Sequence, residues 1–69
     1  MWIIVTLIKE EVPTGSESRL ITLSINKIES IYQAGDHTKI MMESGTIWRS
    51  EDKVIEILDA IFKTMNPIT

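Results

Sequence analysis

The first 50 residues are organised as short apolar runs that alternate with polar turns. Residues 2–9 form a run rich in β-branched side chains, which is typical of a strand. Four similar runs follow, at residues 19–24, 28–33, 38–43 and 46–49. Turn-forming Gly, Asp, Asn and Ser residues separate most of these runs. The pattern predicts five strands, with a longer polar hairpin loop over residues 10–18 between the first two.

The spacing of apolar positions changes from a period of two to a period near 3.6 after residue 50. The apolar positions in this last segment are Val54, Ile55, Ile57, Leu58, Ile61, Phe62 and Met65. They predict an amphipathic helix over residues 51–65, with Ser50 as its N-cap and Pro67 as its stop. On this basis Leu58, Ile61 and Phe62 are expected to be buried against the strands.

These elements predict a single α+β domain over residues 1–69, a small antiparallel meander of about five strands with one C-terminal helix on one face. The first strand is apolar on both of its sides, and one helix covers only one side of a small sheet. The side that carries Trp2, Ile4 and Ile8 therefore needs another cover. A chain this short without disulfides commonly gains that cover by association. We predict a homo-oligomer with these three residues at the interface.

Composition and charge exclude several classes of site. Seven Lys and Arg stand against ten Asp and Glu, so the net charge is −3, which argues against general nucleic-acid binding. The absence of Cys excludes disulfides and thiolate metal sites, and a single His excludes a zinc site built on several imidazoles. No apolar run approaches the roughly 20 residues of a membrane span, and the N-terminus lacks the basic region of a signal peptide. Residence in the cytoplasm is the expectation.

The order of motifs is similar to that of a known family. The segment LSINKIESI at residues 23–31, GDHTKI at 35–40 and Ser44-Gly45, followed by a strand and a helix, resembles the FlbD-type small proteins of swarming motility. The resemblance covers about residues 1–62, with a longer acidic loop in the first hairpin. Residues 25–58 also resemble the central strands of LytTR DNA-binding domains. The FlbD resemblance implies the same fold and a role as a protein-interaction module, and it implies no catalytic residue.

Candidate catalytic groups are few. Asp36 and His37 are adjacent, but neighbours in a turn rarely form part of a catalytic triad. The paired acids at 10–11 and 51–52 suggest no third metal ligand, and there is no phosphate-binding glycine motif. We predict that the protein is not an enzyme and uses no metal or cofactor.

Aromatic and basic residues suggest a ligand site instead. Trp48 and Arg49 are adjacent, and an aromatic ring that stacks on a base together with a guanidinium that binds phosphate suits a nucleotide. The predicted ligand-binding residues are Arg49, Trp48, Arg19, Tyr32 and Lys39. The function expected from the residues is a small oligomeric binding protein that sequesters an anionic nucleotide-like signal, as phage counter-defence proteins do. The alternatives are a protein-interaction module of the FlbD type and, for Trp2 and Trp48, a purely structural role in the core or a subunit interface.

Overall fold

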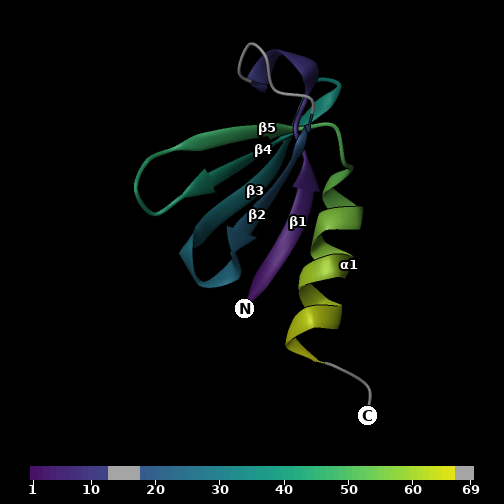
Figure 1. Cartoon of the computed structure of the whole chain (residues 1–69). Helices are drawn as coiled ribbons and strands as arrows, with labels where there is room; N and C mark the ends of the chain where they lie inside the picture. Colours follow the sequence, from purple (N-terminus) through teal and green to yellow (C-terminus); the bar gives the residue numbers. More distant parts are fainter. Residues whose placement is uncertain (13–17, 67–69) are drawn as a thin grey trace.

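A computed structural model of the chain describes residues 1–12 and 18–66 (Figure 1). It contains five strands and one helix, so the predicted α+β class is confirmed. The strands are β1 (Trp2–Thr6), β2 (Leu20–Ser24), β3 (Ile28–Ala34), β4 (His37–Met42) and β5 (Ile47–Ser50). The helix is α1 (Val54–Met65), and short 3₁₀ turns occur at η1 (Lys9–Glu11) and η2 (Ile25–Lys27). The centre of the predicted hairpin loop, 13–17, and the predicted stop at Pro67 lie outside the described residues.

The strands divide into two antiparallel sheets instead of one continuous meander. β1 pairs with β2, and β3, β4 and β5 form a second sheet in that order. The interruption falls at η2, between β2 and β3. The chain joins the sheets at another point, where Leu7 forms a bridge with Ser50 and Ile8 donates its backbone N–H to the carbonyl of Arg49 at 3.0 Å. The residues that follow β1 therefore pair with the end of β5.

The core lies between the two sheets and is closed by α1. Its buried members come from both sheets, from η2 and from the helix: Ile3, Val5, Leu23, Ile25, Ile40, Met42 and Ile57. Ile3 and Val5 alternate with exposed residues along β1, as the period of two predicts. Figure 1 shows α1 running alongside β1, in agreement with the contacts of the helix with β1 and β3.

The helix presents a different side to the core from the one predicted. Ile57 is 2% exposed, whereas Leu58 is 46% and Phe62 is 64% exposed, so the prediction that Leu58 and Phe62 are buried is wrong. Ile61 is half-buried and packs on the core, as expected. The apolar stripe of α1 is wider than the surface that β1 and β3 offer, and its far part, which includes Leu58 and Phe62, stays exposed.

The helix also begins later than the sequence suggests. Ser50 is fully buried at the end of β5 and is not the N-cap. Lys53 occupies the N-cap position, and the Glu56 carboxylate accepts its backbone N–H at 2.8 Å. Glu56 therefore supplies one half of a capping box. The other half does not form, because the Lys53 ammonium cannot accept a hydrogen bond from a backbone N–H.

Candidate functional site

The side of the β1–β2 ribbon that faces away from the core carries exposed apolar residues. Side chains of directly paired residues lie on the same side of a sheet. Three pairs share this side, namely Trp2 with Ser24, Ile4 with Thr22, and Thr6 with Leu20. We call these six residues the outer face. Trp2, Ile4 and Leu20 are 62%, 66% and 58% exposed, values normally found for polar side chains.

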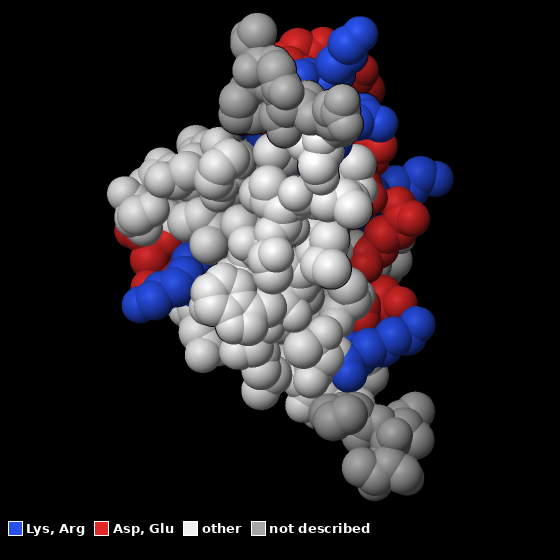
Figure 2. Space-filling view, in the orientation of Figure 1, with Lys and Arg blue, Asp and Glu red and all other residues white. Residues whose placement is uncertain are grey.

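The outer face contains no charged side chain. Each of its pairs combines one large apolar residue with one hydroxyl residue. In Figure 2 the side of the molecule that carries β1 shows a broad uncharged area, while acidic and basic side chains gather towards its margins. Large apolar side chains exposed together on an uncharged area are typical of contact sites.

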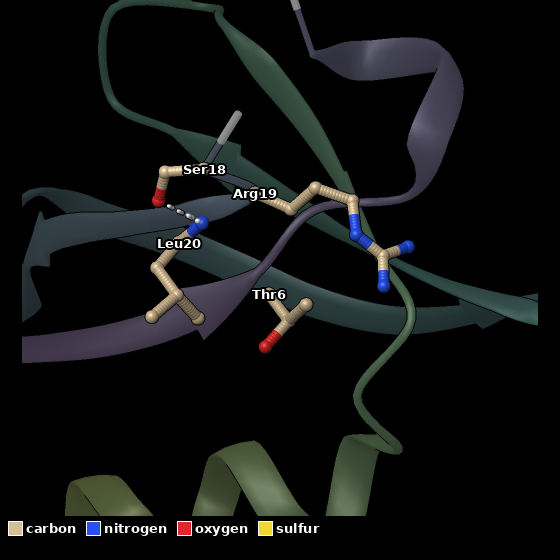
Figure 3. Close-up of a pocket in the computed structure, with 4 residues that line it drawn as sticks. All are labelled: Thr6, Ser18, Arg19 and Leu20. Carbon is tan, nitrogen blue, oxygen red and sulfur yellow. Dashed lines mark hydrogen bonds between the residues drawn. The ribbon is translucent and has the colours of Figure 1, made fainter. Parts of the chain in front are cut away.

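Leu20 belongs to this face but was not predicted to. Figure 3 shows the Leu20 and Thr6 side chains on the same side of the ribbon, with Arg19 directed away from them. These residues border an open hollow together with Ser18. The register between β1 and β2 gives the assignment, and the hairpin sequence alone does not fix that register.

The predicted interface divides in two. Trp2 and Ile4 lie on the outer face as expected. Ile8 does not, because β1 ends at Thr6 and Ile8 leads into η1, where it borders a different hollow beside His37 and Arg49. The strand was predicted to continue to residue 9, and its earlier end removes Ile8 from the alternation.

Three of the five predicted ligand residues form a row across the second sheet. Tyr32 pairs with Lys39, and Lys39 pairs with Arg49. The three side chains therefore share the side of this sheet that faces away from the core. Tyr32 is 39% exposed, and Lys39 and Arg49 are half-buried. Among the described residues Lys39 forms no ion pair.

The other two predicted ligand residues lie elsewhere. Trp48 pairs with Ile40 and packs on the core, so it faces away from Arg49 and cannot stack on a ligand bound by that row. Arg19 donates through Nη1 to Glu51 at 3.0 Å, away from the row. The predicted group of five does not converge in one cleft.

Arg49 is also occupied. Its Nε donates to Glu11, which lies 38 residues earlier in the chain. The neighbouring hollow has a volume of about 460 Å³. It is lined by Ile8, Glu10, Asp36, His37, Arg49 and Glu51. Arg49 is paired with Glu11 and Glu51 with Arg19, so Glu10 and Asp36 contribute the remaining charges of the lining, and their negative sign disfavours a phosphate.

Asp36 and His37 form a hydrogen-bonded pair beside this hollow. His37 Nδ1 lies 3.2 Å from an Asp36 carboxylate oxygen, and this hydrogen bond is the main cause that lowers the pKa of Asp36. His37 Nε2 is buried and has no partner among the described residues. Among the described residues of the lining, none carries a Ser or Thr hydroxyl.

Within 1–12 and 18–66, no cluster of three or more His, Asp or Glu side chains has metal-binding geometry. None of the helices in that part of the chain is long and apolar enough to cross a membrane.

The chain has no match among known protein families, curated proteins or solved structures. The resemblance to FlbD-type proteins and to LytTR strands therefore stays a prediction from the sequence.

Proposed function

We propose that this protein is a non-enzymatic interaction module that assembles with further copies of itself through the outer face of β1–β2. The observation that carries the proposal is the group of Trp2, Ile4 and Leu20, three large apolar side chains more than half exposed on a face whose own six residues carry no charge, with Asp52 and Glu56 at its border beside Ile4 and Thr6. Removing apolar area of this kind from water stabilises the assembly by about 25 cal/mol per Å².

The absence of charge favours a second copy as the partner. The chain carries a net charge of −3, so two copies repel each other over most of their surface. The outer face avoids this cost because none of its six residues is ionised. Its residue sizes are also self-complementary. A two-fold axis that crosses the strands at the Ile4–Thr22 row sets Trp2 over Thr6 of the partner copy and Leu20 over Ser24.

Sedimentation equilibrium of a Trp2→Glu variant tests the proposal. The wild type is expected to be oligomeric at micromolar concentration, and Trp2→Glu is expected to lower the subunit number because it buries a carboxylate in an apolar contact. Ile47→Glu is the matched control, since Ile47 is 41% exposed on the other sheet. A wild-type monomer, or an assembly that both variants leave unchanged, contradicts the proposal.

The Tyr32–Lys39–Arg49 row supports a second candidate function, the binding of an anionic nucleotide-like ligand. The row sets an aromatic ring beside two cations, but Glu11 neutralises Arg49. Release of this contact should therefore strengthen binding. In calorimetric titrations with cyclic dinucleotides and ADP-ribose, Glu11→Gln is expected to raise the affinity and Lys39→Ala to lower it. No heat with the wild type or with Glu11→Gln rejects this candidate.

A further inference from the structure

β2 has an open edge on the side away from β1. Leu7 donates its N–H to the carbonyl of Arg19 at 2.7 Å, and Ile25 donates to the carbonyl of Met1 at 2.9 Å. Hydrogen-bonded and non-hydrogen-bonded pairs alternate along an antiparallel ladder. The odd-numbered residues of β2 therefore bond to β1, and Leu20, Thr22 and Ser24 direct their backbone groups away from it. No strand among the described residues pairs with that side.

Two of the six outward groups are already satisfied inside the chain. Leu20 N–H donates to the Ser18 hydroxyl at 3.2 Å. Ser24 is the N-cap of η2, so its carbonyl accepts the first hydrogen bond of that turn. Within residues 1–12 and 18–66, the groups that remain without a hydrogen-bond partner are the Leu20 carbonyl, both groups of Thr22 and the Ser24 N–H. Thr22 itself is exposed.

These four groups are complementary to themselves. A two-fold axis perpendicular to the sheet, midway between Thr22 and Thr22 of a second copy, sets the two β2 strands antiparallel. Thr22 then exchanges two hydrogen bonds with Thr22 of the partner copy, and each Ser24 N–H donates to the partner's Leu20 carbonyl. In this register no hydrogen bond forms between the Leu20 N–H of one copy and the Ser24 carbonyl of the other. These are the two groups that each chain satisfies internally.

β2 also lacks the features that protect an edge strand. Natural edges commonly carry charged residues, Pro or bulges that prevent pairing. Of the other sheet edges, β3 has Glu29 and an irregular register between Ile28 and Ser30, β1 lies alongside α1, and β5 is bridged at Ser50 by Leu7. β2 reads Leu-Ile-Thr-Leu-Ser, with no charge and no Pro. The difference singles out β2 as the edge that accepts another strand.

We propose that two copies join through their β2 edges and form a continuous four-stranded sheet in the order β1-β2-β2-β1. This inference rests on the proposed self-assembly and specifies a second contact for it. Two strands of five residues span only about 160 Å² of sheet plane, so the outer face of a single copy is small. Edge pairing doubles the outer face in one plane. Two such dimers then pack outer face against outer face, which gives a closed tetramer with three mutually perpendicular two-fold axes.

Cross-linking at Thr22 tests the edge contact directly. In the proposed register the two Thr22 Cα atoms lie about 5.5 Å apart, within the range of about 4.4–6.8 Å that a disulfide spans. The chain has no Cys, so Thr22→Cys introduces a single thiol. Under mild oxidation it is expected to form a disulfide dimer at least tenfold faster than Thr46→Cys, whose thiol is exposed in the β4–β5 turn. Equal rates for the two variants overturn the inference.

A proline at position 22 tests the hydrogen bonds of the edge. The Thr22 N–H points away from β1, so Thr22→Pro removes no bond of the β1–β2 ladder and fits an edge strand. Sedimentation is expected to show a dimer for Thr22→Pro and a tetramer for Thr22→Val, which keeps the N–H. Trp2→Glu is expected to leave the edge-paired dimer, and the double variant should be a monomer.

The outcomes separate the two proposals. An assembly that Thr22→Pro leaves unchanged overturns the edge contact, even where Trp2→Glu reduces the subunit number and so supports the outer face. An assembly that Thr22→Pro reduces and Trp2→Glu does not supports the edge and contradicts the outer face. If Thr22→Pro does not fold, the cross-linking rates of Thr22→Cys and Thr46→Cys still decide.

Discussion

The buried hydroxyl of Ser50 is predicted to stabilise the junction of β1, β5 and α1. Its Oγ donates to the Thr6 carbonyl at 2.7 Å and accepts the Asp52 backbone N–H at 3.0 Å. The Asp52 carboxylate in turn accepts the Thr6 N–H at 2.7 Å, and the Asp52 carbonyl accepts the Thr38 hydroxyl at the same distance. Ser50 and Thr38 are both fully buried.

The loss of unfolding free energy in Ser50→Ala follows from the hydrogen bonds that the substitution removes. The Thr6 carbonyl keeps one bond, because Glu51 N–H also donates to it at 3.0 Å. The Asp52 N–H loses its acceptor, and an unsatisfied buried donor costs about 1–3 kcal/mol. We expect Ser50→Ala to lower the free energy of unfolding by about 2 kcal/mol. In a domain of this size that loss lowers the Tm by about 10 °C.

Urea unfolding followed by circular dichroism measures this effect at one fixed protein concentration. Ser44→Ala is the control, because its hydroxyl bonds only to Thr46 in an exposed turn, and it should change stability by less than about 0.5 kcal/mol. Equal small losses for the two variants would refute the view that the junction stabilises the fold.

Two further predictions concern the helix and the hollow beside Arg49. Ile57→Ala should cost about 2–5 kcal/mol of unfolding free energy and Leu58→Ala less than about 1 kcal/mol, because only Ile57 is buried; urea titrations that rank them in reverse order contradict the helix orientation. The His37 hydrogen bond lowers the pKa of Asp36 below its ordinary value of 3.8. This hydrogen bond therefore stabilises the fold above pH 3.8, and the stabilisation is lost as the pH falls through the folded-state pKa of Asp36. His37→Ala should raise the Asp36 pKa towards 3.8 in an NMR carboxyl titration, and an unchanged pKa would show that His37 is not the cause.

The spacing of apolar residues predicted the strands and the helix, but not which part of the helix is buried. Alternation along β1 places Ile3 and Val5 on the buried side and Trp2 and Ile4 on the other, because successive side chains of a strand point in opposite directions. The change of period located the helix, but seven apolar positions form a stripe that is wider than the core. Which part of that stripe is buried depends on how α1 meets β1 and β3, and spacing along the chain does not contain this information.

Site residues were harder to predict because their partners are distant in sequence. The acids that pair with Arg19 and Arg49 lie 32 and 38 residues away, so neither neutralisation is visible in a local motif. The row of Tyr32, Lys39 and Arg49 depends on the register of three strands. Register also decides that Trp48, although adjacent to Arg49, turns its ring to the core.

The pairing of both arginines bears on which function the fold serves. A site for a multiply charged anion needs free cations that converge, yet Glu51 and Glu11 neutralise Arg19 and Arg49 before any ligand arrives. The apolar residues of β1–β2 show the opposite situation, because Trp2, Ile4 and Leu20 remain more than half exposed. A two-stranded sheet is marginal on its own, and β1–β2 joins the rest of the fold through the core, α1 and the Ser50 junction. Pairing at the β2 edge would give this ribbon the additional strands that its own chain does not provide, so assembly and folding stabilise the same element.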